Sequence, residues 1–295
     1  MAFKPNLSRL MGIKRMSKKI GMSTVAVALA LTCTLTLAGR SCEAPQPLKA
    51  VAIERALTLA ERTAKALDDS GAQVVILARA GQDLSKYGLR YSHLGFAYRQ
   101  NTPATADGQV GKQGHVWRVL HKLNQCGSAE SAIYRQGLGE FFMDDLWRYE
   151  AAWVVPAPAV QAKLLAMLND PARATYMHHK AYNLVSYPWS QKYQQSNQWA
   201  IETLAAVMLS DSTWGMSRSQ AQAWLQFKGY EPTVLNISAM TRLGARVSAA
   251  NVAFDDHPGD KRFSGRIETV TVDSVFAWLP RAGLSAQPYM TYRLW

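Results

Sequence analysis

The sequence predicts an α+β fold in which a central, mostly antiparallel sheet is packed by helices. Three observations support this class. Short β-rich runs occur at 73–78, 91–99, 115–123 and 151–155. Stretches with helical periodicity lie on both sides of these runs. Of the 295 residues, 48% are hydrophobic and 18% are charged, which excludes a disordered chain and supports a large buried core.

A first helix is expected at 47–69, because apolar residues recur there every three or four positions. The stripe consists of Leu48, Val51, Ala56, Leu57, Ala60, Ala64 and Leu67. Gly71 is well placed to end this helix, because glycine adopts the left-handed backbone that often follows a helix.

The run 73–78 is apolar throughout and predicts a buried strand. In the next strand, Gly95 marks a place where another backbone approaches closely. Loops are expected at 81–88 and 101–114, the second rich in Gly, Pro and Thr. The connections are short, so no linker between two domains is visible.

Helices are expected at 160–168, 172–185 and 197–209, with an irregular segment at 186–195. Within 197–209, a buried face is predicted for Trp199, Leu204, Ala205 and Met208, flanked by Ile201. Further along, Ser217 and Gln220 form a capping-box pattern, Gly229 follows the end of that helix, and 267–272 alternates as a strand.

The first 38 residues are typical of a secretion signal. Lys18 and Lys19 precede an apolar run, and Thr36-Leu37-Ala38 offers small residues at the positions that a signal peptidase reads. We therefore expect a signal peptide at 1–38, a periplasmic or secreted protein, and no stable transmembrane segment after cleavage. The alternative is a retained N-terminal membrane anchor, since the run is about long enough to span a bilayer.

The mature chain, 39–295, is expected to form a single α+β domain. Its two cysteines, Cys42 and Cys126, are interpreted as a disulfide, because an exported protein with an even number of cysteines commonly forms one. The alternative makes Cys126 a nucleophile, although a lone reactive thiol is hard to keep reduced outside the cytoplasm.

The charge pattern gives no sign of nucleic-acid binding. Residues 1–38 hold six basic residues and no acid, so the formal net charge of +12 falls to +6 once they are removed. The remaining basic residues are scattered, whereas nucleic-acid recognition needs a basic patch or stripe. Weak attraction to anionic surfaces remains compatible with this composition.

Ser196, at the predicted start of the 197–209 helix, is the candidate nucleophile. A hydroxyl at a helix N-terminus can attack a carbonyl if a base reaches it, because nearby backbone N–H groups stabilise the developing oxyanion. The alternative is that Ser196 is only the helix N-cap, a common role for serine.

Two histidines on neighbouring predicted strands are the candidate base and its orienting group. His93 lies on the second strand and His121 on the third, and adjacent strands lie about 5 Å apart. The alternative is a pair of unrelated half-buried histidines, each bonded to backbone.

The mature chain resembles an uncharacterised exported bacterial family, domain-of-unknown-function family 2145. The segments that carry the resemblance are Tyr91-Ser92-His93-Leu94-Gly95, His121-Lys122-Leu123-Asn124-Gln125-Cys126, Gly139-Glu140-Phe141-Phe142, Gln195-Ser196-Asn197-Gln198-Trp199 and Asp255-Asp256-His257-Pro258. The resemblance implies membership of this family, but the family suggests no particular activity.

A more distant resemblance links about 73–209 to circularly permuted papain-like (NlpC-type) amidases, with 210–295 as a C-terminal elaboration. In those folds a Ser-His-x-Gly pattern marks the histidine strand, and Ser92-His93-Leu94-Gly95 matches it. The resemblance places Ser196 where those enzymes have cysteine, and His121 at the third, orienting position. Serine is a weaker nucleophile than a thiolate, so the same pattern also suits a copy that has lost turnover.

Further residues are expected to form the binding wall of such a site: Asn197 and Gln198 beside Ser196, and Tyr187, Trp189 and Tyr193 upstream of it. The segment 255–260 gathers oxygen ligands and an imidazole, but Asp, Pro and Gly together more commonly form a solvated turn. No cofactor and no metal site is predicted.

Two functions from different classes follow. The first is a hydrolase or acyl-transfer enzyme of the cell envelope that acts on amide or ester bonds of a peptide, peptidoglycan or lipid. The second is a non-catalytic periplasmic binding or assembly module that keeps the cleft without turnover.

Overall fold

The computed structural model describes residues 48–102, 114–209 and 215–294. The predicted signal peptide and Cys42 lie outside the described residues. Within the described ranges, no helix is both long enough and apolar enough to span a membrane.

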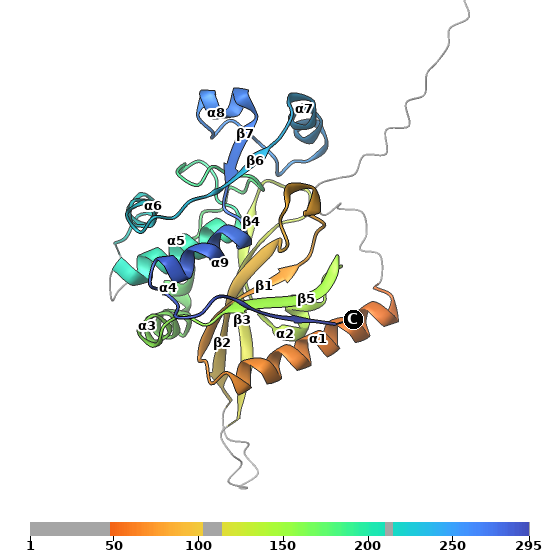
Figure 1. The fold of residues 1–295 in the computed structure, drawn as a ribbon, viewed down its shortest axis with the longest axis vertical. Coiled ribbons are helices and arrows are strands. Elements are labelled where there is room, and N and C mark those ends of the chain that lie inside the picture. Colours follow the sequence, from red (N-terminus) through yellow and green to blue (C-terminus); the bar gives the residue numbers. More distant parts are fainter. Residues whose placement is uncertain (1–47, 103–113, 210–214, 295) are drawn as a thin grey trace, which may run out of the picture. The chain divides into compact units, whose positions relative to one another are not determined.

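In the described part of the chain, six strands form one antiparallel sheet in the order β4-β3-β2-β1-β5-β8 (Figure 1). The strands are β1 (Val74–Ala80), β2 (His93–Asn101), β3 (His115–Asn124), β4 (Ser131–Gly137), β5 (Arg148–Val154) and β8 (Met290–Arg293). The predicted α+β class with a central antiparallel sheet is confirmed.

Helices cover both faces of the sheet (Figure 1). On one face lie α1 (Ala50–Asp69) and α2 (Leu138–Phe142). On the other lie α3 (Pro158–Leu168), α5 (Ser196–Leu209) and α9 (Val272–Arg281), and α6 (Arg218–Phe227) follows α5. Alternate residues of β1 enter the two cores, because successive side chains of a strand point to opposite faces. This explains why every residue of β1 is buried.

A smaller unit extends beyond the sheet (top of Figure 1). It consists of a two-stranded antiparallel sheet, β6 (Thr233–Asn236) and β7 (Arg266–Thr269). The chain between these strands forms α7 (Ala239–Ser248) and α8 (Gly259–Ser264). Its own apolar core is formed by Leu235, Ile237, Ala249, Val252, Phe254 and Ile267. The predicted strand at 267–272 is thus shorter than expected, because Thr271 caps α9 by accepting a hydrogen bond from the Ser274 N–H.

The helix expected at 172–185 is wrong. Only α4 (Pro171–Thr175) forms, and an irregular segment follows up to α5. Its backbone bonds to other parts of the chain instead: the Lys180 carbonyl accepts from the Ser131 N–H, and the Tyr182 N–H donates to the Ala129 carbonyl. These tertiary bonds replace the helical ones that the local pattern favoured.

The expected stripe of the first helix is partly wrong as well. Val51 and Leu57 are exposed, whereas Leu59 and Thr63 are buried. Strand β4 was not anticipated, because it lies at the edge of the sheet and much of it is only partly buried. An edge strand carries a weaker hydrophobic pattern than a central one.

Gly95 confirms the expected close approach between backbones. A Cβ at this position would lie 2.8 Å from the His121 Cβ and 2.9 Å from the Leu120 carbonyl oxygen. Both distances are below normal carbon contacts, so only glycine allows β2 and β3 to pair this closely here.

We expect Gly95→Ala to lower the free energy of unfolding by about 1–3 kcal/mol, because the added methyl group forces β3 and His121 away from β2. Chemical denaturation measures the change. Gly244→Ala is the control, since a Cβ there meets nothing within 4 Å and alanine favours a helix. Equal stability of the two variants would contradict the close-packing argument.

Candidate functional site

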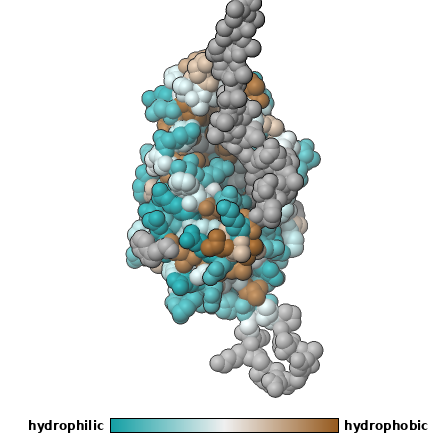
Figure 2. Space-filling view, turned by 90° about the vertical axis from the view of Figure 1, so that its right-hand side faces the viewer, coloured by the Kyte–Doolittle hydropathy of each residue, from teal (hydrophilic) through white to brown (hydrophobic). Residues whose placement is uncertain are grey.

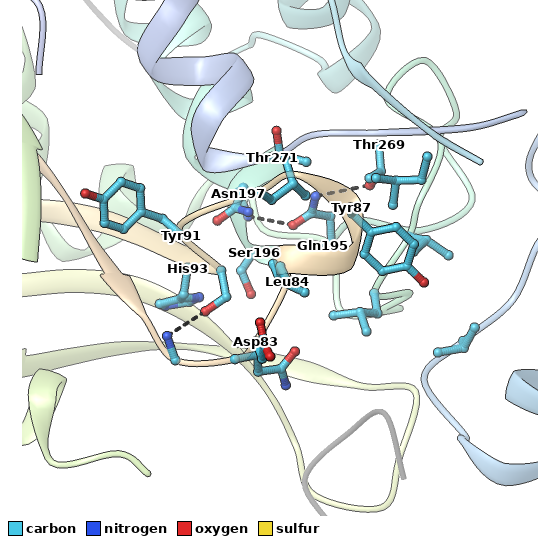
Figure 3. A pocket seen from close by; sticks show the side chains of 18 of the residues that line it. Asp83, Leu84, Tyr87, Tyr91, His93, Gln195, Ser196, Asn197, Thr269 and Thr271 are labelled. Carbon is cyan, nitrogen blue, oxygen red and sulfur yellow. Dashed lines mark hydrogen bonds between the residues drawn. The ribbon is translucent and has the colours of Figure 1, made fainter. Parts of the chain in front are cut away.

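A cavity of about 660 Å³ is formed by the start of β2, the N-terminus of α5 and the β6–β7 unit (Figure 3). Its polar end contains Tyr91, His93, Tyr182 and Ser196. Its walls toward the β6–β7 unit include Leu235, Ile237, Val252 and Phe254. The structure therefore places a polar, titratable group of side chains at one end of a largely apolar cleft.

The two predicted histidines are in direct contact. His93 Nε2 lies 2.8 Å from His121 Nδ1, and His121 Nε2 lies 2.7 Å from the side-chain oxygen of Gln136 on β4. His121 is fully buried behind His93, whereas His93 lines the cavity. The alternative of two unrelated histidines is wrong.

This row of hydrogen bonds fixes the positions of the protons when both rings are neutral. An amide oxygen only accepts, so His121 must carry its proton on Nε2. Its Nδ1 then accepts, and His93 must donate from Nε2. Nδ1 is then the ring nitrogen of His93 that does not face His121.

The ring positions are fixed by packing. The His121 ring meets the Phe141 ring edge-on at a centroid distance of 5.2 Å, and the His93 ring lies 6.0 Å from the same phenyl group. Arg79, opposite His93 on β1, is buried and paired with Asp144 at 2.6 Å. The Phe141 ring thus packs against both imidazoles and against the Arg79 guanidinium, whose carbon lies 4.8 Å from the ring centroid.

Ser196 is the first residue of α5, but it does not cap the helix. The side-chain oxygen of Gln195 accepts the Asn197 N–H at 2.9 Å and takes the capping role. The Ser196 side chain is directed into the cavity that His93 also lines (Figure 3). The N-cap interpretation of Ser196 is therefore wrong.

In the residues that the structure describes, the Ser196 hydroxyl contacts Tyr182 rather than the His93 ring. Ser196 Oγ lies 3.5 Å from the Tyr182 hydroxyl oxygen. Burial raises the pKa of Tyr182 above its usual value, while interactions with the hydroxyl and backbone N–H of Ser196 oppose this shift. Tyr182 therefore stays protonated near neutral pH and can donate a hydrogen bond at the start of α5.

Asn197 and Gln195 attach the start of α5 to its neighbours. The Asn197 side-chain oxygen accepts the Leu94 N–H of β2 at 3.1 Å. The Gln195 side-chain nitrogen donates to the Val270 carbonyl and to Thr269, both next to β7. These contacts tie Ser196 to the histidine strand and to the β6–β7 unit.

The other predicted binding residues lie apart from the cavity lining. Gln198 is fully buried, where it bonds Ser186, the Pro188 carbonyl and Glu202. Trp189 packs on Tyr230, with ring centroids 6.2 Å apart. Tyr187 meets the His257 ring at 5.1 Å, and the Tyr193 carbonyl accepts from Arg218. The aromatic wall of the cavity is supplied instead by Tyr87, Tyr91, Trp147 and Tyr182.

The segment 255–260 consists of a hydrogen-bonded turn followed by the first two residues of α8. His257 lies 3.0 Å from the Asp256 carboxylate and 2.8 Å from the Glu268 carbonyl, while Asp255 pairs with Lys192 at 2.6 Å. Among the described residues, no cluster of three or more potential metal ligands forms.

A buried polar network centred on Glu202 connects α5 to α6 and to the segment before α5. The Glu202 carboxylate accepts from Arg218, Gln194, Gln198 and Gln222, and it is fully buried. Beside it, the Lys122 side-chain nitrogen lies 2.7 Å from the His179 carbonyl and 2.8 Å from the Gln194 side-chain oxygen. Burial lowers the pKa of Lys122 to about 6, the Arg218 charge lowers it further, and Glu202 opposes the shift.

Sequence reasoning missed Tyr182 and Gln136. Tyr182 lay in a segment expected to be helical, and Gln136 lay on the strand that was not anticipated. Gln136 is paired with Val119 and reaches His121 diagonally across the two strands, and such a contact gives no signal until the strand pairing is known.

One family model matches residues 66–279 of this chain; its description is an uncharacterised protein conserved in bacteria, DUF2145. The match covers most of the chain, which therefore belongs to this family. Neither the curated proteins nor the solved structures contain a match to it.

The low pKa of Lys122 predicts a pH dependence of stability. Between pH 6 and 10.5 the unfolded chain binds one more proton at this lysine than the folded chain does. The free energy of unfolding should therefore rise with pH in this window, at up to about 1.4 kcal/mol per pH unit from this group. In Lys122→Met this contribution is lost.

Urea denaturation at pH 6.5 and pH 9 measures the difference between the two pH values. We expect a smaller increase in Lys122→Met than in the unmodified protein. Lys192→Met is the control, because Lys192 is exposed and its pairing with Asp255 raises its pKa. An unchanged increase in Lys122→Met would contradict the assignment of a neutral buried amine.

Proposed function

We propose that this member of the DUF2145 family is a hydrolase or acyl-transfer enzyme that uses Ser196 as its nucleophile and His93 as its general base. One observation carries the proposal: hydrogen bonds from Gln136 through His121 hold the His93 ring in the wall of the cavity that Ser196 also lines. His121 and Gln136 are positioning residues, because they act through the His93 ring.

The proposed reaction begins when the Ser196 oxygen attacks the carbonyl carbon of an amide or ester and its proton passes to His93. The C–O bond forms as the carbonyl π bond breaks, which gives a tetrahedral oxyanion. The donors proposed for that oxygen are the Tyr182 hydroxyl and the backbone N–H of Ser196, which contact each other at the start of α5. His93 then protonates the leaving group as its bond to carbon breaks. Water, or another hydroxyl or amine, finally releases the acyl group from Ser196.

Ser196 Oγ must leave Tyr182 for this reaction, because it contacts the tyrosine in the present arrangement. A change of rotamer about one side-chain bond is a small movement, and catalytic hydrogen bonds in substrate-free sites are often long. The distant resemblance to circularly permuted papain-like amidases supports the same assignment of roles, with serine in place of cysteine.

The second candidate is a binding module without turnover. The contact of Ser196 with Tyr182 favours it, because a serine that stays on a tyrosine has no base. In that case the cavity binds an envelope component, such as a peptide, a peptidoglycan fragment or a lipid, and releases it unchanged.

A serine-directed fluorophosphonate separates the two candidates. We expect the probe to label the protein, Ser196→Ala to abolish labelling, and His93→Gln to slow it by about 10²–10⁴-fold, because the general base is lost. Ser219→Ala is the matched control, since Ser219 is exposed on α6. Labelling that survives Ser196→Ala would refute the nucleophile, and an unlabelled protein with intact fold would favour the binding module.

We also propose export of the chain after cleavage near Ala38 and a disulfide between Cys42 and Cys126. Cys126 lies in the exposed turn between β3 and β4, where another segment of chain can reach it. We expect a peptide pair joined through these cysteines in non-reducing mass spectrometry of protein purified from its native host. Recovery of both peptides unlinked, without reducing agent, would contradict the disulfide.

A further inference from the structure

Helix α7 exposes a stripe of large apolar side chains. Met240, Leu243 and Val247 are 77%, 60% and 83% exposed. They share one side of the helix, because residues three, four and seven apart lie on the same face. Phe263 of the neighbouring α8 is 78% exposed as well. We call these four residues the apolar tip.

The opposite side of α7 faces the interior. Ala245 packs against the core of the β6–β7 unit, and Thr241 and Ala245 line the cavity described above. The helix therefore separates the cavity from the surface that carries the apolar tip. The cavity wall beneath it is itself apolar, with Leu235, Ile237 and Phe254 exposed to the space.

Basic residues border the apolar tip. Helix α7 carries Arg246 and no acidic residue, whereas Arg242 is half-buried and donates to the Ile237 carbonyl. Arg262 of α8 and Arg266 at the start of β7 lie on the adjoining elements. Lys261 of α8 is paired with Glu268, and Asp260 lies in the first turn of the same helix. Figure 2 shows one face of the molecule, on which hydrophilic residues predominate and a group of apolar residues lies in the lower half. Apolar side chains bordered by arginines match the acyl chains and anionic headgroups of a bilayer surface.

We propose that the apolar tip docks this protein on an anionic lipid bilayer. The occupant is a lipid surface rather than a protein because the stripe is narrow, its border is cationic, and an apolar cavity opens directly behind the same helix. Docking places the side chains of Met240, Leu243, Val247 and Phe263 among the acyl chains and the arginines among the phosphates. The proposal does not depend on Ser196 being a nucleophile.

Hydrogen exchange followed by mass spectrometry tests the docking on the full chain, because it reports on each segment separately. We expect vesicles of phosphatidylglycerol to slow amide exchange in 239–248 and 259–264, and vesicles of phosphatidylcholine to have little effect. The segment 218–227 should exchange equally with and without vesicles. Protection of 239–248 that is equal on both lipids would overturn the role of the arginines, and absence of protection on either would overturn the docking.

A double variant, Leu243→Asp with Val247→Asp, supplies the matching mutational test. We expect it to lose the vesicle-dependent protection of 239–248 and to lower the affinity of that segment for the vesicles by about 10-fold or more, because two apolar side chains no longer leave water. Phe227→Asp is the control, since Phe227 is 82% exposed on α6, outside the apolar tip.

Protection that persists in the double variant would refute the proposal. Protection of 239–248 that grows with protein concentration in the absence of vesicles would also refute it, because the apolar tip would then bind a second copy of the chain.

Discussion

The close pairing of β2 with β3 at Gly95 is the constraint on which the proposed site depends. Because Gly95 has no side chain, the backbone and side chain of His121 come within a distance that no other residue allows. His121 can then reach across to Nε2 of His93. The same strand pairing continues to β4, which brings Gln136 to the far nitrogen of His121. One glycine thus aligns three polar side chains from three strands.

The second requirement is a polar start for a buried helix. All residues of α5 from Ser196 to Val207 are buried, so its polar N-terminal side chains need partners within the protein. Gln195 caps the helix, Asn197 bonds β2, and Gln198 joins the Glu202 network. Because these three side chains bond the helix backbone, β2 and Glu202, the Ser196 hydroxyl is not needed there. It points into the cavity, where it contacts Tyr182.

The cavity combines two chemical environments. Its end at His93 and Ser196 is polar, whereas its wall toward the β6–β7 unit is apolar and lies behind α7. A ligand with a carbonyl group near one end and an apolar portion at the other would match both. The outer side of the same helix carries the apolar tip, so chemistry in the cavity and docking on lipid would share one structural element.

The local pattern of the sequence predicted most of the sheet and the two histidines, because buried strands and capped helices leave a periodic signal in few residues. It placed β1, β2, β3, β5, α1 and α5 close to their observed bounds. It failed at 176–185, where long-range backbone bonds to Ala129 and Ser131 replace the helix that local spacing favoured.

By itself, the sequence determined the fold class, the strands that carry His93 and His121, and the glycine between them. The tertiary structure alone decided that Gln195 rather than Ser196 caps α5, that Tyr182 contacts the serine, and that Gln136 completes the row of hydrogen bonds. The contact of Gln136 with His121 and that of Tyr182 with Ser196 join residues that are not neighbours along the chain. The capping by Gln195 depends on the direction of its side chain. Neither kind of information is present in local residue spacing, because it depends on how the whole core is packed.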